Sequence, residues 1–183
     1  MSRWHLNQAI RVIKSGGVIA YPTEAVYGLG CHPGNYQAVK RILRLKQRPV
    51  HKGLILIAAD ISQLEQYISF PDQTIREHVL TTWPGPVTWV LPARPAVPGW
   101  IRGNHDSVAV RVSNHPLVRE LCSRTGPIVS TSANPAGRPP ARSLLKVMNY
   151  FGQSIDYILP GRTGLHRNPT EIRDAKSGKI LRI

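Results

Sequence analysis

The run Leu54-Ile55-Leu56-Ile57-Ala58 decides the fold class, because an unbroken apolar stretch of this length is typical of a strand covered on both faces. A helix is predicted before it, over 36–46, with Asn35 as its N-cap. Helical patterns at 61–67 and 74–83 follow it. Helices placed on both sides of a buried strand predict an α/β fold.

The same alternation extends toward both ends of the chain. Helices are predicted at 6–13, where Gly16-Gly17 supply a stop, at 116–121, where Pro116 comes first, and at 143–151. Strands are predicted at 18–21, 87–91, 107–112, 127–130 and 155–159, with a terminal hairpin at 170–175 and 179–183. The Pro-rich stretch 95–103 is expected to be a loop. We therefore predict one domain over 1–183, an open, twisted, mixed sheet with flanking helices.

The charge balance narrows the class of partner. The chain has 24 Lys and Arg against 10 Asp and Glu, a net charge of +14. Such an excess costs stability through self-repulsion, so it is expected to serve an anionic partner such as a nucleotide, RNA or a membrane surface. A generally basic surface with no specific partner is the alternative.

Several classes of protein are disfavoured. No segment approaches the roughly 18 apolar residues of a membrane span, and the first residues lack the apolar core of a secretory signal, so we expect a cytoplasmic protein. Cys31 and Cys122 form no CxxC or Cys/His cluster, which disfavours a disulfide framework and a structural zinc site. The histidines are scattered without metal-ligand spacing, so no protein-bound metal is predicted, while Mg²⁺ carried on a nucleotide stays open.

Two polar segments are candidates for ligand binding. Lys46 and Arg48 fall where a helix ends before Pro49, and on an extended segment they could grip a polyphosphate, with the arginine binding its oxygens in pairs. A solvated helix face is the alternative interpretation. The segment 130–134, Ser-Thr-Ser-Ala-Asn, follows an apolar strand and could bind an amino acid, a phosphate or a ribose, or could be an ordinary turn.

Two further features add to these. In 21–30, Tyr-Pro-Thr-Glu-Ala-Val-Tyr-Gly-Leu-Gly, the glycines allow close backbone approach and Thr23 and Glu24 are polar, but the pattern of a phosphate-binding GxxxxGK[ST] loop is missing. Arg111 lies between two valines of a predicted strand, and a buried arginine needs an anionic partner. That partner is either a protein carboxylate such as Glu24 or a substrate carboxylate.

In this order, these segments resemble the YrdC/TsaC family of threonylcarbamoyl-AMP synthases. The matching stretches are YPTEAVYGLG at 21–30, LKQRPVHKGLILIAA at 45–59, WPGPVTWVLPA at 83–93, DSVAVRVSNHPL at 106–117, STSANPAGRPP at 130–140 and NPTEIRDAKSGKILR at 168–182. They span almost the whole chain, and the pairing of Lys-x-Arg with Ser-x-Asn is specific to the family. The chain is similar to the short bacterial form, without the extra C-terminal domain of longer members.

The resemblance implies a site for two substrates in a basic concave surface. Lys46 and Arg48 match the residues that hold the ATP phosphates and act in catalysis, and Ser132 and Asn134 match the nucleotide-side Ser-x-Asn pair. Further ATP contacts are implied at Ser107 and Arg182, and threonine contacts at Thr23, Arg111, Ser130 and Thr170. Two departures from the long-form members, which tend to have Asn-Pro and Glu-Ser-Thr at the corresponding places, are Lys52-Gly53 and Pro169-Thr170-Glu171.

The activity implied by the family is a nucleotidyltransferase reaction in which L-threonine, bicarbonate or CO₂ and Mg²⁺-ATP give threonylcarbamoyl-AMP and diphosphate. The product feeds the threonylcarbamoyladenosine modification of tRNA beside the anticodon, with tRNA and threonylcarbamoyl-transferring enzymes as possible partners and no membrane. The basic stretch 40–52 leaves a non-catalytic RNA-binding module as the alternative. A third interpretation, a general amino-acid adenylating enzyme, would form threonyl-AMP without bicarbonate.

Overall fold

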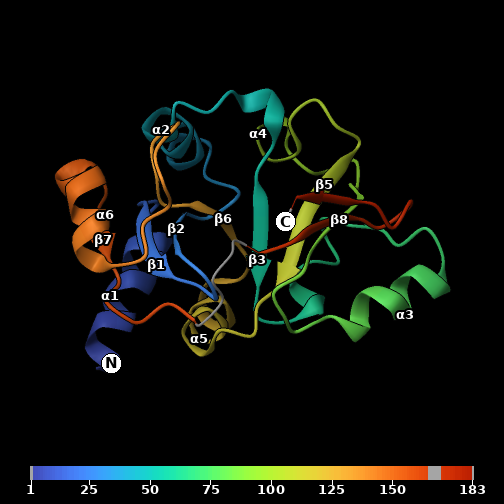
Figure 1. Ribbon diagram of the computed structural model, residues 1–183, viewed down its shortest axis with the longest axis horizontal. Helices are drawn as coiled ribbons and strands as arrows, with labels where there is room; N and C mark the ends of the chain where they lie inside the picture. The colour runs from blue at the N-terminus through green and yellow to red at the C-terminus, as the bar shows by residue number, and fades with distance from the viewer. Residues whose placement is uncertain (1, 165–169, 183) are drawn as a thin grey trace.

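The computed structural model describes residues 2–164 and 170–182, which form a mixed sheet with helices on its faces (Figure 1). The strands are β1 (Ile19–Pro22), β2 (Tyr27–Gly30), β3 (Ile55–Ala58), β4 (Thr88–Pro92), β5 (Ser107–Val112), β6 (Ile128–Ser132), β7 (Tyr157–Ile158), β8 (Ile172–Asp174) and β9 (Ile180–Arg182). The α-helices are α1 (Arg3–Lys14), α2 (Tyr36–Lys46), α3 (Gln73–Thr81), α4 (Gly99–Arg102), α5 (Pro116–Thr125) and α6 (Leu144–Phe151). Short 3₁₀ turns occupy Val50–Lys52, Ile61–Gln63 and Gly152–Ser154.

The nine strands lie in the order β7-β1-β2-β6-β3-β5-β4-β8-β9. The pairs β1/β7, β3/β5 and β4/β8 are parallel, and the other neighbours are antiparallel. At the centre of this order lie β6, β3 and β5, joined by the registers Ile55↔Ser130 and Ile57↔Arg111. Arg111 and Ser130, far apart in sequence, are thereby placed two strands from each other.

The helices cover the two faces of the sheet unequally. One core contains the apolar sides of α1 and α5, with Ile19, Ile57 and Ile128 from the strands beneath them. The other core is larger and contains buried residues of α2, α3, α4 and α6, with Leu56, Val110 and Val129 among others. Because side chains alternate along a strand, neighbours such as Leu56 and Ile57 serve opposite cores.

The face covered by α1 and α5 continues beyond them as an open surface. Along β5, Val108, Val110 and Val112 point into the larger core, so Ser107, Ala109 and Arg111 point to this opposite face. Along β6, Ile128 is covered by the smaller core, whereas Ser130 and Ser132, on the same side of the strand, lie in the lining of a cleft. The polar residues of these strands therefore form the floor of that cleft.

Several predictions from the sequence are confirmed. The α/β class, the mixed sheet, the terminal hairpin and the N-cap are all present, and the side chain of Asn35 accepts a hydrogen bond from the backbone N–H of Ala38.

Two observations concern the membrane and the cysteines. Within the part of the chain that the structure describes, no helix is long and apolar enough to cross a membrane. Cys31 and Cys122 are both buried, and their thiols are free.

Other predictions were wrong. The helical pattern at 61–67 yields only the 3₁₀ turn Ile61–Gln63, and the loop at 95–103 contains the short helix α4. The strand β2 was not predicted, and β6 continues through Ser132 into the segment interpreted as a loop. Ile183, the expected end of the hairpin, lies outside the described residues.

Candidate active site

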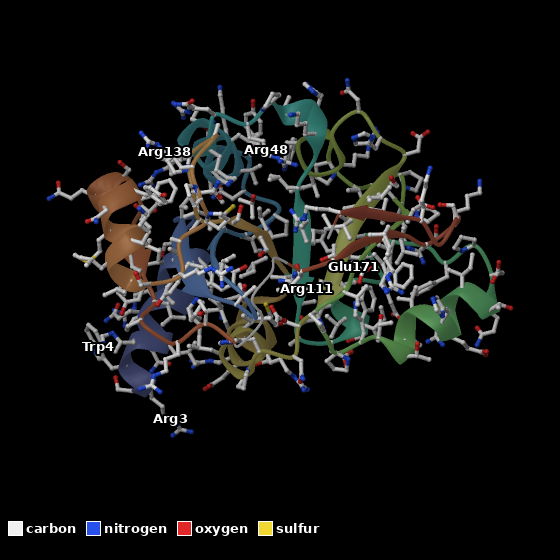
Figure 2. The ribbon with its side chains drawn as sticks, viewed as in Figure 1. Arg3, Trp4, Arg48, Arg111, Arg138 and Glu171 are labelled. Atoms are coloured by element: carbon white, nitrogen blue, oxygen red, sulfur yellow. The ribbon has the colours of Figure 1, made fainter. Side chains whose placement is uncertain are left out.

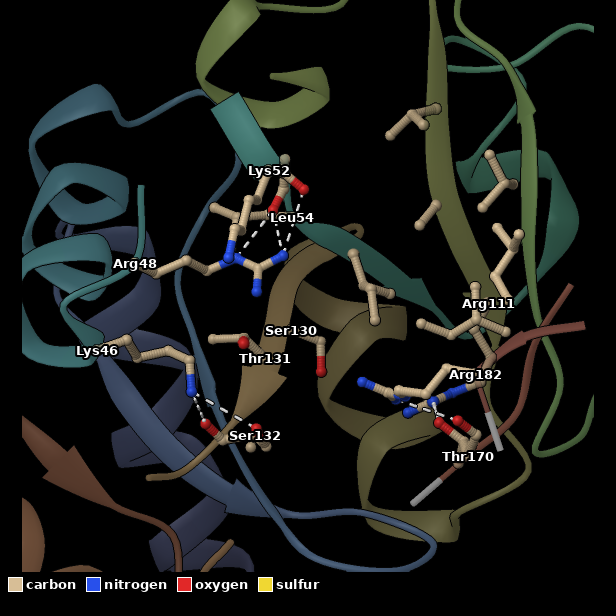
Figure 3. Close-up of a pocket in the computed structure, with 18 of the residues that line it drawn as sticks. Lys46, Arg48, Lys52, Leu54, Arg111, Ser130, Thr131, Ser132, Thr170 and Arg182 are labelled. Atoms are coloured by element: carbon tan, nitrogen blue, oxygen red, sulfur yellow. Dashed lines mark hydrogen bonds between the residues drawn. The ribbon is translucent and has the colours of Figure 1, made fainter. Parts of the chain in front are cut away.

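A cleft of about 730 Å³ opens over the centre of the sheet, and all ten residues proposed for the site line it. They are Thr23, Lys46, Arg48, Ser107, Arg111, Ser130, Ser132, Asn134, Thr170 and Arg182. Figure 3 shows Lys46 and Arg48 on one side of the cleft and Arg111, Thr170 and Arg182 on the other, with the β6 segment containing Ser130 to Ser132 between them. The structure thus brings these residues together, while their individual roles stay a prediction.

The C-terminal end of α2 places Lys46 and Arg48. Lys46 is the last residue of the helix, and Gln47 adopts a left-handed conformation with φ of 50°. This turn, rather than the extended segment expected from the sequence, sends both neighbouring cations into the cleft. Lys46 is buried, and burial together with the nearby charge of Arg48 lowers the pKa of its ammonium to about 8.

Lys46 connects the Lys-x-Arg segment to the Ser-x-Asn segment. Its Nζ donates to the backbone oxygens of Ser132, at 2.5 Å, and Asn134, at 3.0 Å. The side-chain oxygens of the same two residues lie 3.5 and 3.3 Å away. An ammonium has three N–H donors, fewer than these four acceptors, so a phosphate that accepts from Lys46 would have to displace one of these contacts.

Arg48 is held by backbone oxygens of the segment that follows it. Its Nη2 donates to the oxygens of Gly53, at 3.0 Å, and Lys52, at 3.3 Å. Gly53 has φ of 60° and ψ of 178°, a conformation essentially restricted to glycine. Proline fixes φ near −65°, so this segment differs in backbone from any relative that has Asn-Pro here.

Arg111 is the most buried cation of the cleft. Its side chain is 5% exposed and its Nη2 lies 3.3 Å from the Glu24 Oε2, so the protein carboxylate considered from the sequence is indeed a partner. The hydroxyl of Ser113 donates to the other oxygen, Glu24 Oε1, at 2.6 Å. Burial acts to raise the pKa of Glu24, but the charge of Arg111 and the Ser113 hydrogen bond hold it below its ordinary value.

The remaining donors of Arg111 indicate where a ligand would bind. Nη1 donates to the hydroxyls of Thr88, at 3.3 Å, and Thr170. Nε is buried and has no hydrogen-bond partner among the described residues. A buried unpaired donor is costly, so the Arg111 guanidinium, which lines the cleft, would gain from an acceptor that a ligand supplies.

Hydroxyl groups complete the floor beside Arg111. The Tyr21 hydroxyl donates to the Ser130 Oγ at 2.7 Å, which leaves the Ser130 hydroxyl hydrogen available for a ligand. The Thr23 hydroxyl donates to the backbone oxygen of Val26 at 2.7 Å, so its lone pairs remain as acceptors. This corner can therefore recognise a small polar ligand with both donor and acceptor groups.

Cations dominate the lining of the cleft. In Figure 2, Arg111 lies near the centre of the molecule and Arg48 above it, whereas Arg3 lies at the lower left edge. The basic residues that line the cleft are Lys46, Arg48, Lys52, Arg102, Arg111 and Arg182. Asp174 is the one carboxylate among its described lining residues, and its Oδ1 already accepts hydrogen bonds from Ser177. In the described ranges no group of three or more His, Cys, Asp or Glu could hold a metal ion.

Sequence reasoning missed several residues of this site. Thr88 and Ser113 belong to the Arg111 network, and Tyr21 positions Ser130. Thr88 and Tyr21 lie between non-polar neighbours and Ser113 lies at the start of a polar segment, so periodicity alone gave no signal for any of them. Pro169, one of the departures from longer relatives, lies outside the described residues.

Comparison with known proteins agrees with the resemblance found in the sequence. Residues 11–183 match the Sua5/YciO/YrdC family model, described as "Telomere recombination". Two proteins called threonylcarbamoyl-AMP synthase are similar over nearly their whole length. That of Stutzerimonas stutzeri is 54% identical over 98% of this chain and 97% of its own, and that of Nitrosococcus oceani is 56% identical over the same shares.

Solved structures match as well. P. abyssi Sua5 complexed with L-threonine superposes with a TM-score of 0.92 at 34% identity and covers 100% of this chain, which spans 54% of that longer one. E. coli YciO superposes with a TM-score of 0.83 at 28% identity, covering 94% of this chain and 84% of its own.

Proposed function

The chain belongs to the Sua5/YciO/YrdC family, and we propose that it is a threonylcarbamoyl-AMP synthase, an enzyme of the nucleotidyltransferase class. It joins L-threonine, bicarbonate or CO₂ and ATP into threonylcarbamoyl-AMP and releases diphosphate. The observation that carries the proposal is one cleft of about 730 Å³ with Lys46 and Arg48 on one side and the buried Arg111 on the other. Its size suits a nucleotide beside an amino acid.

The nucleotide is proposed to bind on the Lys46 side. Lys46 and Arg48 would contact the phosphates, with Arg182 reaching them from the opposite wall. Ser107, Ser132 and Asn134 would supply neutral hydrogen-bonding groups. Mg²⁺ is proposed to arrive on the phosphates, since the one lining carboxylate, Asp174, is engaged and the described residues offer no protein cage. When bound, the ion would offset phosphate charge.

Threonine is proposed to bind on the Arg111 side. Its carboxylate would accept from the unpartnered Nε edge of Arg111, and its hydroxyl would meet Ser130 and Thr23. Thr170 lies beside the same arginine. Valine lacks the hydroxyl, so its binding would leave buried polar groups unpaired, which is costly and favours threonine.

The chemistry asks for positioning and charge neutralisation. The threonine amine attacks the carbon of CO₂, loses a proton to solvent and becomes a carbamate. A carbamate oxygen then attacks the α-phosphorus, and the bond to the bridging oxygen breaks as diphosphate leaves with the electron pair. No protein nucleophile is required. Lys46 and Arg48 would stabilise the charge that grows on the departing diphosphate, an effect that can supply several kcal/mol.

Diphosphate release by the purified protein tests the proposal, with threonine and bicarbonate each present or omitted. Release that needs both, with the mass of threonylcarbamoyl-AMP in the products, is expected. Threonyl-AMP formed without bicarbonate would favour a general adenylating enzyme instead. No release, from folded protein that binds RNA in a strongly salt-dependent way, would favour a non-catalytic RNA-binding module.

Matched variants test the residues. Lys46→Ala and Arg48→Ala are expected to abolish most turnover while the fold is retained. Lys14→Ala is the control, because Lys14 also ends a helix but is exposed far from the cleft. Arg111→Ala is expected to raise the threonine KM more than the ATP KM. Normal turnover in the Lys46 variant, or the reverse KM pattern in the Arg111 variant, would reassign that residue.

The proposed product would feed threonylcarbamoyladenosine formation in tRNA, which places the reaction in the cytoplasm. Enzymes that move the threonylcarbamoyl group to adenosine would then be partners. The products of the assay, incubated with such an enzyme and unmodified tRNA, should give the modified nucleoside by mass spectrometry. Failure with authentic threonylcarbamoyl-AMP as a working control would argue against this role.

A further inference from the structure

Thr170 contacts two cations on the same wall of the cleft. Its hydroxyl oxygen accepts a hydrogen bond from Nη1 of Arg111, which is proposed to bind threonine. Its backbone oxygen accepts from Nη2 of Arg182, which is proposed to reach the nucleotide, at 3.1 Å. Figure 3 shows both guanidiniums directed at this one residue. A single residue therefore joins the groups proposed to bind the two substrates.

The Arg111 end of this link is fixed. The arginine is 5% exposed, its Nη2 pairs with Glu24, and its Nη1 also donates to Thr88, which is fully buried. A guanidinium held in this way by a buried carboxylate and two hydroxyls has little freedom to turn. A carboxylate that binds Arg111 therefore meets a guanidinium that is already oriented, with the Thr170 hydroxyl beside it.

The Arg182 end is held much less firmly. Arg182 belongs to β9, an edge strand that pairs with β8 through the registers Ile172↔Arg182 and Arg173↔Ile180, with an irregularity between them. The neighbouring Ile180 and Leu181 are about half exposed. The hydrogen bond to Thr170 is thus a substantial part of what orients the Arg182 guanidinium, because a long side chain on an edge strand is otherwise free to sample rotamers.

Like charges surround the link. Partial burial of the Arg182 side chain, and then the charges of Arg111 and Arg48, lower the pKa of Arg182. A carboxylate and phosphates bound at these cations would repel one another, so charge alone does not favour simultaneous occupation of the cleft. Favourable coupling must therefore come through the hydrogen bonds of Thr170.

We infer that Thr170 is a positioning residue that couples the two substrate sites, so that threonine on Arg111 and nucleotide on Arg182 each strengthen binding of the other. The inference rests on the proposed function. Threonine bound against Arg111 and Thr170 restrains the Thr170 backbone, whose oxygen holds Arg182 toward the phosphates. Coupling of this kind is reciprocal, so nucleotide bound at Arg182 orders the same segment for threonine. The consequence is that amine and α-phosphorus are brought together before the short-lived carbamate forms.

Calorimetric titration measures the coupling directly. Threonine is titrated into the full-length protein with and without Mg²⁺ and α,β-methylene-ATP, which cannot release diphosphate, in buffer freed of bicarbonate. The coupling factor is the ratio of the two threonine Kd values, and about fivefold or more is expected for the unmodified protein. The hydroxyl is the link between Arg111 and the Thr170 backbone, so Thr170→Val is expected to bring the factor close to one.

Two matched variants separate the link from simple loss of a hydroxyl. Thr170→Ser keeps the hydroxyl and is expected to keep the full factor. Thr88→Val removes another hydroxyl from the same nitrogen of Arg111, but Thr88 has no hydrogen bond to Arg182 in the described structure, so its factor is also expected to stay. Circular dichroism establishes whether each variant folds. If Thr170→Val does not fold, Arg182→Lys, which removes the Nη2 donor, is measured in its place.

Three results would each overturn the inference. The first is a coupling factor of one in the unmodified protein. The others are an unchanged coupling factor in Thr170→Val and a loss of coupling in Thr88→Val as large as that in Thr170→Val. In those cases threonine and nucleotide still bind, and the proposed function stands. Failure of the unmodified protein to bind threonine at all would remove the proposed function together with the inference.

Discussion

Replacement of Glu24 by alanine is predicted to destabilise the protein by about 3–5 kcal/mol, the usual result of removing one partner of a buried ion pair. The Arg111 and Glu24 side chains are 5% and 6% exposed, and their charged atoms lie 3.3 Å apart. Alanine would leave the Arg111 charge buried without its carboxylate and would leave the Ser113 hydroxyl without its acceptor at 2.6 Å. Both losses act in the same direction.

The expected loss is large relative to the total free energy of unfolding. A protein of this size is stable by about 5–15 kcal/mol, so Glu24→Ala would remove a third or more of it in most of that range. At about 2–4 °C of Tm per kcal/mol, the melting temperature should fall by about 6–20 °C. Urea unfolding at neutral pH, followed by circular dichroism, gives the free energy, and Glu120→Ala, at an exposed position of α5, is the control expected to stay within about 0.5 kcal/mol.

A double variant separates the ion pair from packing. Glu24→Ala combined with Arg111→Met replaces both charges, and it should be more stable than Glu24→Ala alone because no buried charge is left unpaired. A loss below about 1 kcal/mol in Glu24→Ala, or a double variant less stable than both single ones, would refute the reasoning. The effect should also depend on pH. The pKa of Glu24 is lowered by folding, so its contribution is complete above its ordinary value of 4.5 and is lost as pH falls below that value.

Three further predictions concern the nucleotide side and helix α2. Because the pKa of Lys46 is about 8 in the empty cleft, the affinity for α,β-methylene-ATP should weaken as pH rises through 8, and Lys46→Arg should remove this limb in a calorimetric pH series. Gly53→Pro forces φ from 60° to about −65°, so it should lower the Tm. It should also weaken nucleotide binding, because Arg48 loses its contact with the Gly53 carbonyl. An unchanged nucleotide Kd would show that the position of Arg48 does not depend on this backbone conformation. Asn35→Ala removes the cap of α2 at the Ala38 N–H and should cost about 0.5–2 kcal/mol in urea unfolding, with no change in threonine affinity.

The sequence predicted most elements correctly because their signals are local. The cap at Asn35, the apolar run of β3 and the β-branched run of β5 each decide their structure within a few residues. The site residues were found because the two motifs resemble a known family. What periodicity could not supply was their arrangement, since Arg111 and Ser130 meet only through strand order.

The failures have tertiary causes. At the end of the segment 61–67 the chain is tied to Arg94, whose Nε donates to the oxygens of Glu65, at 2.7 Å, and Ile68, at 2.9 Å, and whose N–H donates to Tyr67. No local sequence pattern predicts a contact with a residue so far along the chain. These bonds hold the chain where a helix would have to continue beyond Ile68, and within the segment the N–H of Leu64 bonds to the oxygen of Ile61 in a 3₁₀ turn.

The strand β2 was missed for a different reason. Glycine is a weak strand former, and β2 contains two of them. Gly30 is needed there because a Cβ would lie 2.7 Å from both a ring carbon of Tyr21 and the backbone oxygen of Val129. The residue that weakened the strand signal is thus the one that lets β1, β2 and β6 pack closely.

The distribution of charge bears on the RNA-binding alternative. The cleft is lined by six cations and Asp174, a net of five of the chain's +14. Arg167 lies outside the described residues, so eight excess positive charges lie elsewhere in the described part of the chain. ATP and threonine need none of those eight. If they serve tRNA, RNA affinity should fall steeply with salt and should be nearly unchanged when saturating Mg²⁺-ATP fills the cleft. Competition between ATP and RNA in a filter-binding assay would instead place RNA in the cleft, and absence of RNA binding at low salt would leave the outer charges as a generally basic surface.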